Sequence, residues 1–142
     1  MIAAEIAIRA WVTGKLNLVG PGNPLANGAF TRTQRSPASG CYAVLARTTG
    51  TNRDVVAEPA PGLTSAMIAF TVYGGTAETA EIAASALATE IEKLAGCPEP
   101  AGPGVNVLVA SGLTGPTSVP WAPDAGEQFA FNLSAEFLLA AA

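Results

Sequence analysis

The side chains that most often move protons or bind metals are scarce in this sequence. Histidine is absent, so neither a Ser-His nor a Cys-His nucleophile can be assembled. Cys41 and Cys97 stand alone, and without histidine they cannot complete a four-ligand zinc site. Their spacing leaves a disulfide open, although we favour two reduced thiols. We therefore expect no catalytic residue, no metal site and no cofactor.

The carboxylates and lysines do not form an acid–base arrangement either. Glu90 and Glu92 stand near the end of a predicted helix and point in different directions, unlike the facing carboxylates of a glycosidase. Lys15 and Lys93 lack the strongly apolar surroundings that activate a lysine. The sequence thus favours a protein that is not an enzyme.

A glycine turn, Gly74 and Gly75 followed by Thr76, joins a predicted strand to a predicted helix. Such a turn at a helix N-terminus can bind an anion through free backbone N–H groups. No basic residue or further glycine pattern accompanies this one. We therefore favour a tight reversal in which Thr76 caps the helix.

The composition indicates one domain that buries part of its surface against other subunits. The chain has 142 residues, 49% of them hydrophobic and only 13% charged, against about 25% charged in an average soluble protein. Its apolar runs are far shorter than the about 20 residues of a membrane-spanning helix. Glu5 interrupts the one segment that resembles a signal peptide. A surface poor in charge favours a homo-oligomer.

The charge balance argues against gripping nucleic acid. The net charge is −4, and the arginines at 32, 35, 47 and 53 are loosely grouped without interleaved aromatic residues. An acidic protein gains no affinity from counterion release. If DNA passes near this protein, its charge suits passage rather than binding.

The elements that position these residues are centred on residues 66–96. Residues 66–73 read as a strand, and after the glycine turn residues 76–95 read as a long helix that Gly96 ends. One apolar seam follows this helix: Ala80, Ala84, Leu87, Ile91 and Leu94. The opposite side carries glutamates, so the seam is expected to pack on a sheet.

The rest of the chain supplies one more helix and several strands. Residues 2–14 predict a short helix with Trp11 as a core anchor. Strands are expected at 41–48, 55–58, 105–110 and 129–139, separated by Pro- and Gly-rich segments at 17–40, 97–104 and 111–126. The prediction is a single α+β domain, residues 1–142, with a mainly antiparallel β-sheet packed with two helices.

The run AFTVYGGTAETAEIAASALATEIEKLAG resembles the tail terminator (tail completion) proteins of long-tailed phages, particularly those of actinobacterial hosts. In that family an aromatic residue and a glycine end a strand, a Thr or Ser caps an Ala- and Glu-rich helix, and glycine follows. Three more features match in order: Trp11 in a short helix, the strand CYAVLART, and a loop with Trp121, Pro123 and Asp124 before a final alternating strand. The chain departs from the family pattern in the connector from 19 to 40.

The resemblance implies a structural virion protein of the tail–neck region, assembled in the host cytoplasm. Such proteins form a ring, typically of six copies, on the head-proximal end of the tail tube. They stop tube polymerisation and dock the head connector, and DNA passes through the lumen. The implied partners are further copies of the chain, the tail-tube protein and the connector, with no membrane.

A closed ring needs two different patches of one subunit to meet. The candidate residues for a subunit or tube interface are Trp121, Pro123, Asp124, Arg32 and Arg35. An unpaired sheet edge is a further candidate, because it invites strand addition.

Two other readings stay open. One is another ring protein of the same neck, a connector or stopper, or a tail-tube subunit. The other is a small dimeric α+β domain that binds a ligand or regulates.

Trp121→Ala should leave the fold intact and yield tails of uncontrolled length, because tryptophan is a favoured interface anchor. Electron microscopy of tails from a phage carrying the variant measures their length distribution. Tails of normal length would support the alternative role of Trp121, a loop residue that covers the core.

Overall fold

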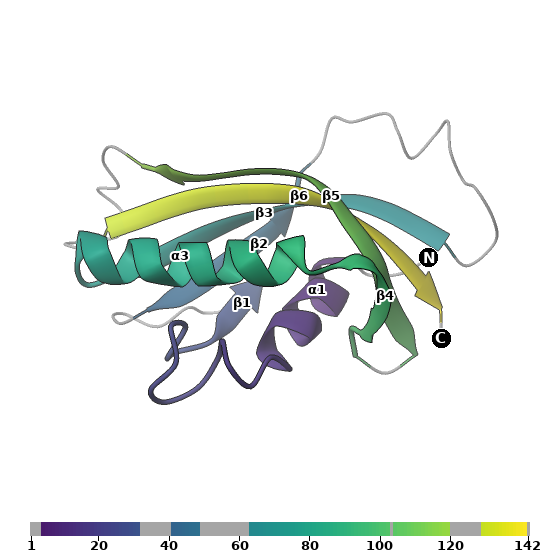
Figure 1. The fold of residues 1–142 in the computed structure, drawn as a ribbon, viewed down its shortest axis with the longest axis horizontal. Coiled ribbons are helices and arrows are strands. Elements are labelled where there is room, and N and C mark those ends of the chain that lie inside the picture. The colour runs from purple at the N-terminus through teal and green to yellow at the C-terminus, as the bar shows by residue number, and fades with distance from the viewer. Residues whose placement is uncertain (1–3, 32–40, 49–62, 103, 120–128, 142) are drawn as a thin grey trace.

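The computed structural model describes residues 4–31, 41–48, 63–102, 104–119 and 129–141. Two helices and six strands follow one another along the chain (Figure 1): α1 (Ala4–Thr13), β1 (Ala29–Thr31), β2 (Tyr42–Arg47), β3 (Leu63–Gly74), α3 (Ala77–Glu92), β4 (Ala95–Pro100), β5 (Val105–Ser118) and β6 (Phe129–Ala141). The predicted strand at 55–58 lies outside the described residues.

One six-stranded sheet, in the order β1-β2-β3-β6-β5-β4, organises the domain. Only β1 and β2 are parallel, and all other neighbours are antiparallel. The two central strands pair along the whole of β3, from Leu63 opposite Ala140 to Gly74 opposite Phe129. The expected α+β fold with a mainly antiparallel sheet and two helices is confirmed.

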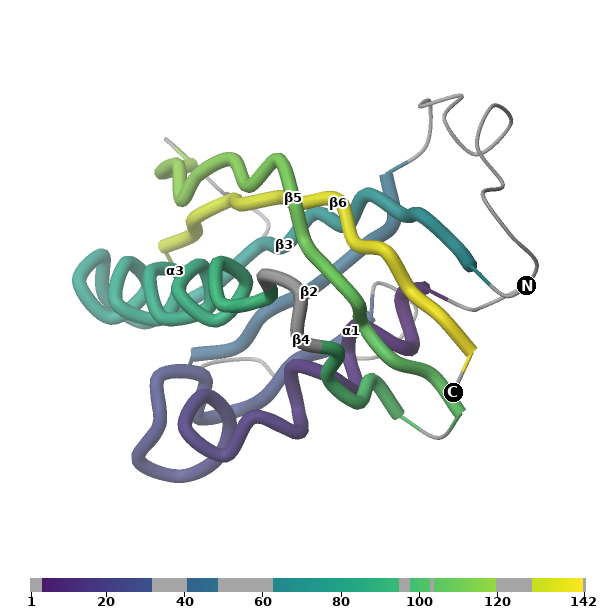
Figure 2. The backbone as a smooth tube through the Cα atoms, turned by 45° about the vertical axis from the view of Figure 1, so that its right-hand side comes forward, coloured from purple at the N-terminus to yellow at the C-terminus, as the bar shows by residue number. Residues whose placement is uncertain are grey.

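Both helices lie on the same face of the sheet, α3 across β3, β6 and β5 and α1 across β1 and β2 (Figures 1 and 2). Alternation along β6 turns its aromatic residues toward them. Phe137 is the centre of the core, since its ring lies 6.1 Å from those of both Trp11 and Phe70. The largest fully buried side chains are Trp11, Phe70, Phe137, Ile8, Leu18, Leu25, Leu45, Ile68, Leu87, Ile91, Leu94 and Leu139.

The start of α3 agrees with the sequence prediction. The Thr76 hydroxyl accepts from the Thr79 N–H at 3.1 Å, and the Thr79 hydroxyl accepts from the Thr76 N–H at 3.2 Å, which makes a capping box. The two glycines differ in role. A Cβ on Gly74 would lie 2.8 Å from the backbone nitrogen of Ala80, whereas one on Gly75 would meet nothing within 4 Å. Gly74 therefore allows the helix to approach the strand closely, and Gly75 does not.

The end of α3 differs from the prediction. The helix ends at Glu92 with Lys93 as its C-cap, and Gly96 lies inside β4 rather than at the helix end. Leu94 turns back into the core and its N–H donates to the Ile91 carbonyl. An edge strand therefore begins where the sequence predicted a helix stop followed by a loop, because prolines are tolerated on a sheet edge.

Two more expectations were wrong in extent. The strand predicted at 105–110 continues to Ser118 as β5, through a stretch assigned to a loop. Bulges shift its register against β6 between Ser111 and Thr114 and again before Thr117, which accommodates the glycines and the proline. The Pro- and Gly-rich connector holds the short strand β1, which pairs with β2.

Gly74→Ala should lower the free energy of unfolding by about 1–3 kcal/mol, because the added methyl group meets backbone atoms that cannot move aside. Urea denaturation followed by circular dichroism measures the loss. Gly75→Ala is the matched control and should change stability by no more than about 0.5 kcal/mol. Equal losses in the two variants would contradict the assignment of the close contact to Gly74.

Candidate functional site

All five candidate interface residues lie outside the described residues: Trp121, Pro123, Asp124, Arg32 and Arg35. The segment with the first three leads into β6 at Phe129, and the segment with the two arginines follows β1 at Thr31. Their part in an interface stays a prediction.

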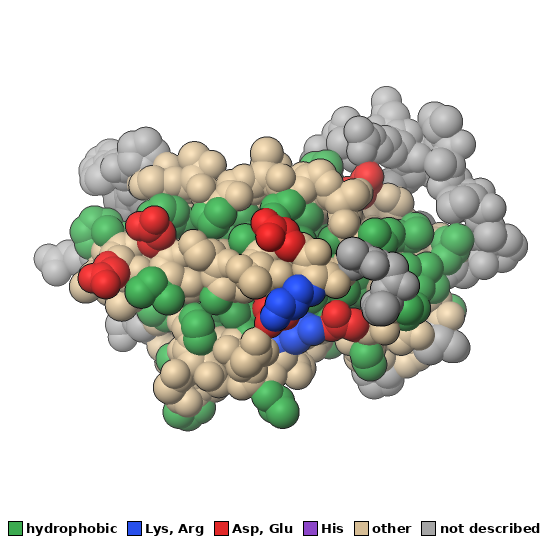
Figure 3. Space-filling model, viewed as in Figure 1, with side chains coloured by type: hydrophobic (Ala, Val, Ile, Leu, Met, Phe, Trp, Pro, Cys, Tyr) green, Lys and Arg blue, Asp and Glu red, His purple; other side chains and the backbone are tan. Residues whose placement is uncertain are grey.

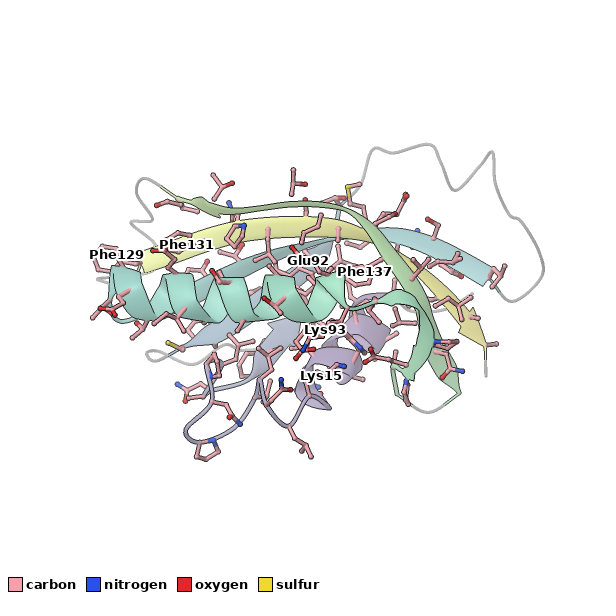
Figure 4. The ribbon with its side chains drawn as sticks, viewed as in Figure 1. Lys15, Glu92, Lys93, Phe129, Phe131 and Phe137 are labelled. Atoms are coloured by element: carbon pink, nitrogen blue, oxygen red, sulfur yellow. The ribbon has the colours of Figure 1, made fainter. Side chains whose placement is uncertain are left out.

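The charged side chains of the described chain gather where α1, α3 and β4 converge (Figures 3 and 4). We call this group the polar clamp; it consists of Trp11, Lys15, Asn17, Glu90, Lys93 and Glu99. Lys15 forms an ion pair with Glu99, and its Nζ lies 5.2 Å from the centre of the Trp11 ring. Trp11 Nε1 donates to the same Glu99 oxygen at 3.2 Å. These contacts join the end of α1 to β4.

The second half of the clamp surrounds Glu90, which is only 6% exposed. Asn17 Nδ2 donates to its carboxylate at 2.6 Å, and Lys93 Nζ donates to it at 3.5 Å. The hydrogen bond from Asn17 is the main cause that lowers the pKa of Glu90. Burial opposes it, and the charges of Lys93 and Lys15 lower the pKa further. The carboxylate is therefore ionised at neutral pH and ties the connector after α1 to α3.

The polar clamp suits stabilisation better than proton transfer. Both carboxylates face lysines, and an ionised carboxylate whose pKa is lowered is a poor general acid or base at neutral pH. Within the described ranges, no three side chains of the His, Cys, Asp and Glu types are grouped to hold a metal ion. Cys41 is a free thiol.

Sequence reasoning missed the clamp, although one signal was present. Glu90 lies three residues after Leu87 and four before Leu94, so helical periodicity places it beside the apolar seam rather than on the wet side. Its partner Asn17 and the Glu99 of β4 come from distant segments, and no local pattern identifies them.

The sheet surface away from the helices forms a second candidate site, which we call the open face. No described element packs on it (Figure 1). In register across it lie Ala46, Ala69, Ser134 and Thr114. Glu136 is its one charged residue in the described strands, which is few for a solvated sheet face.

Polar and aromatic side chains order one end of the open face. The Thr71 hydroxyl donates to Asn132 Oδ1 at 3.1 Å across the two central strands. Tyr42 and Tyr73 stack with ring centres 5.0 Å apart, and Phe30 meets Tyr42 edge to face at 6.2 Å. These contacts make this end of the open face a firm surface.

The two sheet edges are not equivalent. At the β1 edge, Arg9 Nε donates to the Ala29 carbonyl at 2.9 Å, and the Arg47 N–H donates to Glu5 at 2.8 Å. Helix α1 thus occupies backbone groups that another strand would need. At the other edge, β4 pairs only with residues 106–109 of β5, so in the described part of the chain residues 111–118 have no strand on their outer side.

Neither described helix combines the length and the apolar character that crossing a membrane would require. No protein-family model matches the sequence, and no curated protein matches it.

Asn17→Ala should lower the free energy of unfolding at neutral pH by about 1–3 kcal/mol, because the buried Glu90 carboxylate loses a donor. The folded state lowers the pKa of Glu90, so this stabilisation is present above the ordinary value of 4.5 and is lost as the pH falls through the folded-state pKa. The difference between variant and parent should therefore shrink on acidification, which urea titrations at a series of pH values measure.

Asn23→Ala is the matched control, because Asn23 donates only to the backbone carbonyls of Leu16 and Val19. Its effect on stability should not change with pH. A pH-independent effect of Asn17→Ala as well would contradict the role of Glu90.

Proposed function

We propose that this chain is a structural protein of a long-tailed phage whose copies form a ring on the head-proximal end of the tail tube. The ring ends tube polymerisation and docks the head connector. Two lines of support meet here: the resemblance of residues 69–96 to tail terminator proteins, and the uncovered surface of the sheet.

The open face is the observation that carries the proposal. A two-layer domain needs to bury only one sheet face, and here the buried side holds the core beneath α1 and α3. The other side exposes Ala46, Met67, Ala69 and Leu138 in part, with Glu136 as its one described charge. Apolar surface of this extent is typical of a subunit contact.

The edges favour contact through surfaces rather than a continuous sheet. A ring of subunits joined edge to edge needs two open edges, and α1 occupies the β1 edge through Glu5 and Arg9. The β5 edge contains Pro116, which has no N–H to donate, and two bulges. These features disfavour strand addition there.

The described basic residues support passage of DNA without specific binding. Lys15 pairs with Glu99 and Lys93 with Glu90, while Arg9 and Arg47 donate to backbone carbonyls. Each therefore has an acceptor inside the chain, and a net charge of −4 adds no attraction to phosphates.

The proposal is tested by adding the purified chain to tail-tube protein that is polymerising in vitro. Growth should stop at amounts far below one chain per tube subunit, and native mass spectrometry should detect a closed ring. Immunogold microscopy of tails should place the label at the head-proximal tip only. The Gly75→Ala variant, expected to fold normally, is the control for the assay.

Label along the whole shaft would instead identify a tube subunit. Unchanged tube growth together with no label on tails would refute the proposal.

A further inference from the structure

The helix layer carries an apolar surface of its own beside α1. Ile6 is 67% exposed on α1 and Leu16 is 90% exposed just after it. Exposed side chains of this size are unremarkable one by one. Here they flank a helix whose charged residues, Glu5 and Arg9, are bound to the sheet edge. The outer side of α1 is thus nearly neutral and ends in two large aliphatic groups.

The other helix presents a different surface. Glu78, Glu81 and Glu92 are exposed along α3, around the half-exposed Ile82. Placing these carboxylates on the open face would bring them toward Glu136, and like charges in contact are destabilising. The neutral surface beside α1 meets no such repulsion. Of the two helices, α1 is therefore the better match for the open face.

We propose that the open face of one subunit binds Ile6 and Leu16 of the next copy of this chain. This proposal rests on the ring function and names its subunit contact. The two surfaces belong to opposite layers of the domain, so each copy offers one and receives the other. Such a heterologous contact repeats from copy to copy and closes into a ring when the rotation permits.

The size of the open face agrees with a subunit contact. Strand spacing and rise give β2, β3, β6 and β5 together a footprint of about 700 Å². A partner in an interface of standard size buries about 800 Å². The small side chains at Ala46, Ala69 and Ser134 let the aliphatic groups of a neighbour approach the backbone.

Cysteine cross-linking tests the contact directly. In a background with Cys41 and Cys97 changed to serine, Leu16→Cys and Ala69→Cys are introduced into separate chains, one of them with a tag that changes its mass. Mixed under conditions that give the ring, the two chains should be joined to each other by a short bismaleimide, and neither should be joined to itself. One chain with both changes should give a ladder that ends at the ring.

Two results would overturn the contact. Self-linking of the Ala69→Cys chain would mean that two open faces meet around a two-fold axis. A ring that forms without any link between the positions would refute this contact and leave the proposed function standing. If native mass spectrometry finds no ring even with tube protein present, both proposals fall.

Matched substitutions supply a second measurement. Ile6→Ser and Leu16→Ser should each weaken subunit association about tenfold or more, the expected loss for a buried aliphatic side chain. Ile82→Ser removes an exposed isoleucine from the acidic side of α3 and should leave association unchanged. Thermal melting checks that all three variants fold. Equal weakening by Ile82→Ser would refute the choice of α1.

Discussion

The pairing of β3 with β6 is the constraint on which the rest of the structure depends. Its register places Ala66, Ile68, Phe70 and Val72 beside the apolar positions of β6, all on one side of the sheet. A slip of one residue would turn this whole set to the other side. Both helices, the connector and the outer strands pack on the surface that this register creates, with Phe137 at its centre.

The long connector after α1 shows how a segment without regular structure is held. Leu18 and Leu25 are buried in the core, so the segment contributes apolar contacts of its own. Asn17 and Lys15 then fix its start to α3 and β4 through two carboxylates. A buried carboxylate is costly unless it is paired and hydrogen-bonded, and Glu90 meets both conditions. The position of the connector is therefore set by a few specific contacts.

The sequence predicts those parts of the fold that depend on local pattern. Alternation along residues 129–139 and the seam of α3 identify the two layers, and Thr76 identifies the helix start, because each signal lies within a few residues. The end of α3, the extension of β5 and the strand β1 depend on pairing with distant strands, so Gly96 and the prolines of β4 were assigned to a stop and a loop. Of the surfaces that could carry function, local pattern gave the helix surfaces, whereas the polar clamp and the closed β1 edge required the fold.

The order in which the strands leave the ribosome follows from the same central pair. β3 is synthesised long before β6, and α3 and β5 come between them. Until β6 emerges, the apolar side of β3 has no neighbour on that side, and only α3 is near enough in sequence to cover it. Pairing over such a separation is slow compared with helix formation. Nascent chains therefore expose apolar surface during translation, which gives host chaperones an opportunity to bind before any subunit can assemble.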